Sequence, residues 1–191
     1  MDTQVEDRAA RTRRQILEAA ARILGKDPSA SMSEVAAAAG VGRTTVHRQF
    51  GSREELLVAL ALEAIDQLTE ALTEARPGEG PAPEALARIA ESVFPMANEF
   101  RYLDLGPELW ELPQLKDRWY SVERALDEVV KRGQREGHLR ADLPTALIAD
   151  LFASALWSLN DSIREGRVAR RDALPGLLAV LLHGVSAGGS R

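Results

Sequence analysis

The sequence predicts an all-α protein, and three observations lead to this fold class. Alanine, leucine, glutamate and arginine, which favour helices, dominate the 191 residues. No segment alternates apolar and polar residues as a half-buried strand would. Ser31 with Glu34, and Ser52 with Glu55, have the spacing of a capping box, which begins a helix. We therefore expect three short N-terminal helices, joined by a long helix to a C-terminal helical bundle.

Four helices are expected in the first part of the chain. They cover residues 12–25, 32–39 and 43–49, followed by a long helix from the Ser52 cap to about residue 75. Gly40 ends the second helix as a glycine after its last turn. The apolar stripe of the fourth helix is expected at Leu57, Leu60, Ala61, Ala64, Leu68 and Leu72. We place a first domain at residues 1–53 and a second at residues 54–191.

The second domain is expected to consist of helices separated by Pro- and Gly-rich segments. The clearest linker is the segment Arg-Pro-Gly-Glu-Gly-Pro-Ala-Pro at residues 76–83. A second break contains Gly106, Pro107 and Pro113, and a loop occupies residues 137–144. The expected helices lie at residues 84–100, 114–136, 145–165 and 171–185.

The second and third helices have the spacing of a helix-turn-helix, with a Gly40–Gly42 turn between them. Their inward positions are apolar: Val35, Ala36, Ala39, Val46 and Phe50. The outward positions of the third helix are polar or basic: Arg43, Thr44, Thr45, His47, Arg48 and Gln49. Such a helix fits the major groove, where arginine pairs with guanine, glutamine with adenine, and a threonine methyl packs on thymine. The pattern therefore predicts DNA binding.

The charge distribution agrees with this prediction, although the whole chain carries −5. Residues 8–53 contain nine basic and three acidic residues, a net charge of +6, which leaves −11 for the remainder. A basic head on an acidic body is expected when one end of a protein contacts phosphates.

Residues 35–57 read VAAAAGVGRTTVHRQFGSREELL, which resembles the signature of the TetR family of transcriptional repressors. The resemblance implies a long connecting helix, an all-helical ligand-binding body and a homodimer on double-stranded operator DNA. It assigns DNA contacts to Arg13, Ser31, Met32, Ser33, Arg43, Thr44, Thr45, His47, Arg48, Gln49 and Arg53. The chain departs from the family's usual residues at Gly42, His47, Gln49 and Arg53.

The last two helices are expected to form the dimer interface. Helix 145–165 is apolar almost all round, and helix 171–185 has the same character. A helix without a polar face should be covered on both sides, so we expect these two helices to pair with their copies across a two-fold axis.

A pocket for an unidentified small-molecule effector is expected in the body. Large aromatic side chains with a few polar groups suit a mostly apolar site. The candidates are Phe94, Asn98, Arg101, Tyr102, Trp110, Trp119, Tyr120, Glu123, Trp157 and Asn160. We expect the linker at residues 76–83 and the break before Pro113 to absorb a ligand-driven shift.

Several other classes of protein are disfavoured. The chain has no cysteine and only three histidines, which lack metal-ligand spacing, so we expect no metal and no cofactor. It lacks a long apolar run and an apolar N-terminal segment, so we expect a cytoplasmic protein without a membrane span or signal peptide. No nucleophile–base pair or phosphate-binding loop indicates an enzyme. The open alternatives are an enzyme, a helical interaction protein, and an activator with the same architecture.

Overall fold

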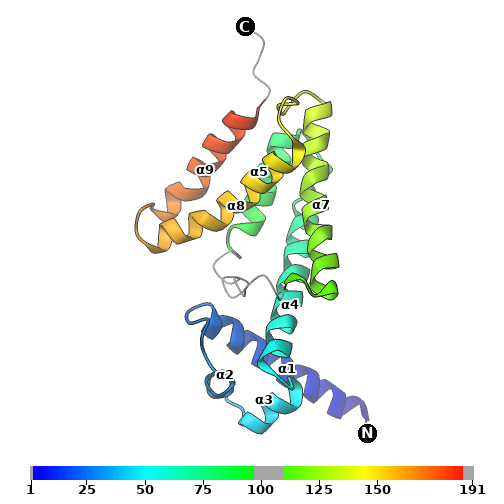
Figure 1. Cartoon of the computed structure of the whole chain (residues 1–191), viewed down its shortest axis with the longest axis vertical. Coiled ribbons are helices and arrows are strands. Elements are labelled where there is room, and N and C mark those ends of the chain that lie inside the picture. Colours follow the sequence, from blue (N-terminus) through cyan, green and yellow to red (C-terminus); the bar gives the residue numbers. More distant parts are fainter. Residues whose placement is uncertain (1, 97–109, 187–191) are drawn as a thin grey trace. The chain divides into compact units, whose positions relative to one another are not determined.

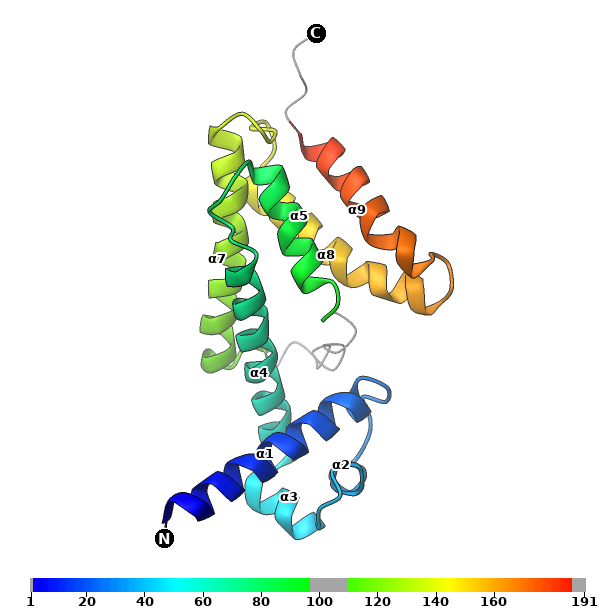
Figure 2. The same cartoon turned by 180° about the vertical axis from the view of Figure 1, so that it is seen from behind.

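The computed structural model describes residues 2–96 and 110–186, with side chains from residue 8 onward. These residues form eight α-helices and no strand beyond one isolated bridge between Leu139 and Ser186. The predicted all-α fold is confirmed (Figures 1 and 2). The helices are α1 (Asp2–Leu24), α2 (Met32–Ala38), α3 (Arg43–Gln49), α4 (Arg53–Glu74), α5 (Ala82–Val93), α7 (Pro113–Arg135), α8 (Thr145–Arg164) and α9 (Arg170–Val185).

The chain divides into two compact units. Of the described residues, 2–65 and 110–116 belong to the first unit, and 66–96 and 117–186 belong to the second. The division falls inside α4, between Ile65 and Asp66. Residue 53, where we place the domain boundary from the sequence, is the first residue of this same helix.

The core of the first unit joins α1, α2, α3 and the start of α4. Ile16, Val35, Val46 and Phe50 are at most 1% exposed. On α4 the buried stripe begins at Leu56 rather than at the expected Leu57, which is only half-buried. The expected stripe positions from Leu60 to Leu72 are all buried. The prediction is therefore wrong only in the first turn of α4, where packing against the neighbouring helices determines which side of the helix is buried.

The second unit has its core between α5, α7, α8 and the second half of α4. Leu86, Val130, Ile148 and Phe152 are buried there. Helices α8 and α9 lie side by side, joined by a short loop, in both views (Figures 1 and 2).

The segment between α4 and α5 is held by two arginines. Arg88 donates hydrogen bonds to the carbonyl oxygens of Ala75, Arg76 and Glu79, and Arg132 donates to those of Pro77, Gly78 and Gly80. The six distances are 2.6–3.1 Å. A loop whose backbone accepts six hydrogen bonds from side chains is a poor hinge. These bonds do not favour residues 76–83 as the place where a ligand-driven shift is absorbed.

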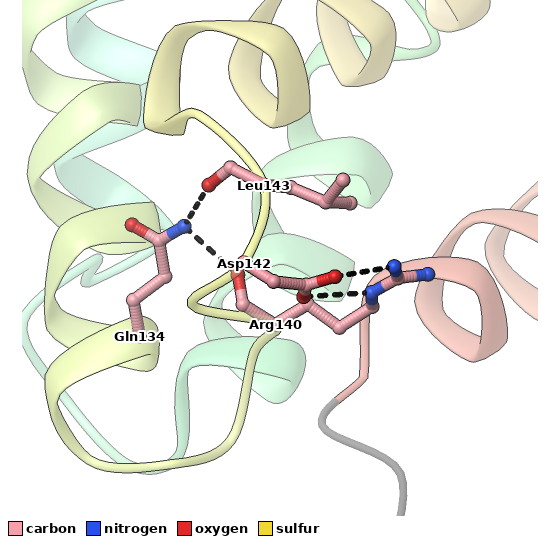
Figure 3. A network of polar contacts seen from close by, with 4 residues as sticks. All are labelled: Gln134, Arg140, Asp142 and Leu143. Carbon is pink, nitrogen blue, oxygen red and sulfur yellow. Dashed lines mark hydrogen bonds and ion pairs between the residues drawn. The ribbon is translucent and has the colours of Figure 1, made fainter.

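The loop between α7 and α8 is organised by Gln134 (Figure 3). Its amide nitrogen donates to the carbonyl oxygens of Arg140, at 2.9 Å, and Leu143, at 2.8 Å. Its amide oxygen accepts a 2.8 Å bond from the hydroxyl of Thr145, the first residue of α8. The guanidinium of Arg140 also pairs with Asp142, whose pKa is lowered chiefly by this hydrogen bond. These bonds fix the direction in which α8 begins.

Two helix boundaries differ from the prediction by more than two residues. Helix α1 begins at Asp2 and not at residue 12, because the preceding residues favour helix although they lack an apolar stripe. Helix α5 ends at Val93, seven residues before the expected Phe100. Pro95 explains this early end, since it has no backbone N–H to donate the hydrogen bond that would continue the helix.

Candidate nucleic-acid interface and ligand pocket

Helix α2 and its following turn have the predicted local structure. The Ser31 hydroxyl accepts from the backbone N–H of Glu34 at 3.3 Å, and the Glu34 carboxylate accepts from the backbone N–H of Ser31 at 2.7 Å. These two bonds complete the capping box. The pKa of Glu34 is lowered, first by the Ser31 backbone N–H and then by the Ser31 hydroxyl, because both donate to its carboxylate. Gly40 has φ +65°, and Val41 N donates to Ala36 O at 3.0 Å, so the chain turns sharply towards α3.

Helix α3 buries one side and exposes the other. Val46 and the capping residue Phe50 are buried. Arg43, Thr44, His47 and Arg48 are exposed, and Thr45 and Gln49 are half-buried. The exposed side therefore carries two arginines, a histidine and a threonine, which is the composition expected of a surface that contacts both phosphates and base edges.

Arg13 of α1 holds the C-terminal end of α3. Its Nη1 atom donates a 3.0 Å hydrogen bond to the carbonyl oxygen of Gln49. Its guanidinium carbon lies 4.3 Å from the centre of the Phe50 ring. Arg13 thus fixes the helix that would read DNA, in addition to the phosphate contact expected from the sequence.

Arg53 and Gln15 hold the other parts of the helix-turn-helix. The guanidinium of Arg53 donates to the carbonyl oxygens of Pro28 and Ala30, so the first residue of α4 secures the loop that precedes α2. Gln15 of α1 donates a 2.7 Å bond to Ala39 O at the end of α2. No local pattern in the sequence indicates these contacts, because they join residues 23–25 positions apart.

The remaining candidates lie at the start of α2. Ser31 is exposed, but its hydroxyl and its backbone N–H both bond to Glu34. Met32 and Ser33 are half-buried in the first turn of the helix. The structure thus leaves the outward side of α3 as the most accessible part of the expected interface.

The second unit contains a cavity of about 400 Å³. It is bounded by α4, α5, α7 and α8, and its walls are mostly apolar. The lining residues are Leu68, Leu72, Ile89, Val93, Trp119, Val122, Glu123, Leu126, Asp127, Ala149, Asp150, Phe152, Ala153, Ser154, Leu156 and Trp157. Its volume is within the usual range of small-molecule sites.

The cavity brings together three of the ten ligand-binding candidates: Trp119, Glu123 and Trp157. Phe94 and Asn160 are buried but do not line it. Tyr120 is 49% exposed, and Trp110 belongs to the first unit; neither lines it. Asn98, Arg101 and Tyr102 lie outside the described residues.

Sequence reasoning missed two carboxylates of the cavity, Asp127 on α7 and Asp150 on α8. A signal for Asp127 was present, because Trp119, Glu123 and Asp127 follow one another at intervals of four residues and so share one side of a helix. On that side the indole Nε1 of Trp119 donates a 2.7 Å hydrogen bond to Glu123 Oε1.

Helices α8 and α9 retain apolar side chains that this single chain does not cover. Leu147 and Leu151 of α8 are 43% and 52% exposed, although Ile148 and Phe152 beside them are buried. Val180 of α9 is 72% exposed, and Ala173 is the one buried residue among those described for this helix.

Comparison with known proteins identifies the family. Residues 16–60 match the family model described as bacterial regulatory proteins, tetR family. The chain is also 34% identical over 165 residues to the HTH-type transcriptional repressor LfrR of Mycolicibacterium smegmatis, covering 86% of this chain and 82% of the relative. The chain belongs to the TetR family of transcriptional regulators.

Other TetR-family regulators resemble the chain over nearly its full length. The HTH-type transcriptional regulator NfxB of Pseudomonas aeruginosa is 28% identical over 173 residues, covering 90% of this chain and 92% of the relative. The crystal structure of LfrR from Mycobacterium smegmatis in complex with proflavine superposes with a TM-score of 0.78 at 30% identity, covering 92% of this chain and 96% of that one.

Membership of the TetR family excludes the enzyme alternative, since these proteins are DNA-binding regulators of transcription. In the described part of the chain, no group of three or more acidic or histidine side chains could hold a metal ion. None of the described helices is both long and apolar enough to cross a bilayer.

Proposed function

We propose that this TetR-family chain is a ligand-responsive repressor that binds a near-palindromic operator as a homodimer. The observation that carries the proposal is the exposed side of α3, with Arg43, His47 and Arg48 outward and Val46 buried behind them. As a regulator acting on bacterial DNA, it would work in the cytoplasm.

Arg43 and Thr45 would read bases at the start of α3, and Gln49 would do so at its end. Arg43 is exposed, and its long side chain can pair with guanine in the major groove. His47 and Arg48 would contact phosphate or base edges. Arg13 and Arg53 already bond to backbone carbonyls, yet each guanidinium has five N–H donors, so both can also contact phosphate.

The homodimer would form through α8 and α9. The exposed leucines of α8 and the largely uncovered α9 support this interface, because large exposed apolar patches are rare on monomers. A two-fold axis there would give the pair of recognition helices that a palindromic operator needs, about 34–36 Å apart.

The effector would bind in the cavity of the second unit. The complex of the relative LfrR with proflavine supports a ligand in this fold, and the cavity here has a suitable size. Leu68 and Leu72 line the cavity and lie on α4, the helix that begins at Arg53 beside the DNA-binding helices. A ligand that displaces these leucines would shift α4 and favour a conformer that releases DNA.

A gel-shift titration on the DNA upstream of the chain's own gene, at several salt concentrations, tests the proposal. Binding should weaken steeply as salt rises, because phosphate contacts release counterions. Arg43→Ala should weaken binding by about 1–3 kcal/mol and relax specificity at one base pair of each half-site. Arg124→Ala, at an exposed position of α7, is the matched control and should leave binding unchanged. Binding that is absent, or insensitive to both salt and Arg43→Ala, would overturn the proposal.

A further inference from the structure

Arg53 joins the two ends of the segment that contains α2, the turn and α3. It is the first residue of α4 and follows closely on Phe50, the capping residue at the end of α3. Its Nη1 atom donates to the carbonyl oxygen of Ala30, directly before the capping residue of α2. Its Nη2 atom donates a 2.5 Å bond to the carbonyl oxygen of Pro28. One side chain therefore closes the chain between residues 30 and 53 into a ring.

The loop that Arg53 grips is itself well ordered. Both the backbone N–H and the hydroxyl of Ser29 donate to Asp27 Oδ1, at 2.9 Å and 2.6 Å. The backbone N–H of Ala30 donates to Asp27 O at 3.1 Å, and the Ala30 side chain is 3% exposed. The pKa of Asp27 is lowered chiefly by the Ser29 bonds and, to a smaller extent, by the charge of Arg53. A loop held in this way passes the grip of Arg53 on to the start of α2.

The turn between α2 and α3 leaves the orientation of these helices to contacts elsewhere. Gly40 and Gly42 flank Val41, and Gly42 caps α3 without a side-chain hydrogen bond. Glycine restricts the backbone less than any other residue. The orientation of α3 therefore depends on the buried side chains, such as Val46, and on the bonds that tie the ends of the segment together.

The grip uses the shape of the arginine side chain as well as its charge. Arg53 is half-buried, and each of its two terminal nitrogens donates to a different carbonyl oxygen. The planar guanidinium presents its donors in a rigid fork, whereas the lysine ammonium is a point charge on a flexible stem. Lysine at this position would keep the charge and lose the fixed double contact.

We infer that Arg53 is a positioning residue for operator recognition, which holds α3 in its reading orientation by tying the residues before α2 to the start of α4. The inference rests on the proposed role of α3 and goes beyond the phosphate contact proposed for Arg53. A phosphate contact requires a positive charge, whereas positioning requires the grip on both carbonyl groups. The two roles therefore respond differently to lysine.

Arg53→Lys tests the inference by fluorescence anisotropy on two duplexes of equal length, the DNA upstream of the chain's own gene and an unrelated sequence. Operator affinity should fall at least about fivefold, because a charge-assisted contact that fixes α3 is lost. Affinity for the unrelated duplex and the salt dependence of both should be unchanged, because the charge is kept. Arg22→Lys, at an exposed position in the last turn of α1, is the matched control and should change neither affinity.

Two outcomes of this titration would overturn the inference. Wild-type operator affinity in Arg53→Lys would show that the charge alone is needed. An equal loss on both duplexes would show general destabilisation, because a smaller folded fraction weakens specific and non-specific binding alike.

Amide hydrogen exchange of the free protein tests the same grip without DNA. In Arg53→Lys, residues 40–50 should exchange faster than in the wild type, because the segment opens more readily, and α8 should be unaffected. Equal exchange at residues 40–50 in the two proteins would contradict the inference.

The two experiments separate this inference from the proposed function. Operator binding by the wild type, without any effect of Arg53→Lys, overturns the positioning role and leaves the proposed function standing. Absence of wild-type operator binding overturns the proposed function, whatever the exchange rates are.

Discussion

The guanidinium of Arg13 lies 4.3 Å from the centre of the Phe50 ring, and the same side chain bonds to the carbonyl oxygen of Gln49. Both partners lie at the C-terminal end of α3, and Arg13 belongs to α1. The recognition helix is therefore secured at its end by a charged side chain from outside the helix-turn-helix, while Val46 secures its middle through the core.

Replacing Arg13 with alanine should destabilise the first unit. The variant loses a charge-assisted hydrogen bond and a cation–π contact, and because the site is exposed we expect a cost of about 1 kcal/mol. Urea unfolding followed by circular dichroism measures this free energy. Arg14→Ala is the control, since Arg14 is exposed on the same helix, and its effect should stay within about 0.5 kcal/mol. Equal losses in the two variants would show that Arg13 has no special contact with α3.

The local features of the DNA-binding head could be predicted because neighbouring residues determine them. Ser31 and Glu34 form the capping box they predict, and Gly40 has the positive φ that its turn requires. The bonds of Arg13 to Gln49 and of Arg53 to Pro28 could not be predicted, because they join residues 36 and 25 positions apart. Such contacts depend on how the helices pack, which no short motif specifies.

The cavity could be predicted only in part for a similar reason. Trp119 and Trp157 were identified by their size and region, and both line it. Phe94 and Asn160 come from the same region of the sequence, but both are buried away from the cavity. Asp150 is exposed and also lines the cavity, and a single acidic residue in an apolar helix gives no sequence signal for that position.

The capping box should make the stability of the protein depend on pH through Glu34. Hydrogen bonds from Ser31 lower the pKa of Glu34 in the folded chain below its ordinary value of 4.5. The stabilisation is therefore complete above the ordinary value and is lost as the pH falls through the lowered one. As the pH falls below 4.5, the free energy of unfolding should fall more steeply for the wild type than for Glu34→Gln. Glu70→Gln, in the exposed part of α4, should retain the wild-type slope, and a retained slope in Glu34→Gln would contradict the prediction.

Gly133 should not tolerate a methyl group, although it lies within helix α7. A Cβ atom there would lie 2.6 Å from Ala82 Cβ and 2.7 Å from the side chain of Leu139. Alanine gains about 1 kcal/mol in helix propensity, but overpacking costs about 1–3 kcal/mol, and the Ala82 methyl cannot move without its backbone. We therefore expect Gly133→Ala to lower the melting temperature. Gly78→Ala, where nothing lies within 4 Å, should leave it unchanged or slightly raised, and a stable Gly133→Ala protein would refute the expected clash.

Leu151 offers the sharpest test of the proposed dimer, because it is 52% exposed in a helix whose opposite side is buried. In a two-fold interface each substitution is present twice, so Leu151→Glu would place two carboxylates in an apolar contact, where unpaired charge is costly. Light scattering should show a monomer, circular dichroism should show unchanged helix content, and operator affinity should fall because two half-sites are no longer bound together. Tyr120→Glu alters an apolar residue that is 49% exposed on α7 and should leave the dimer intact. If Leu151→Glu remained dimeric, the interface would have to lie away from this part of α8.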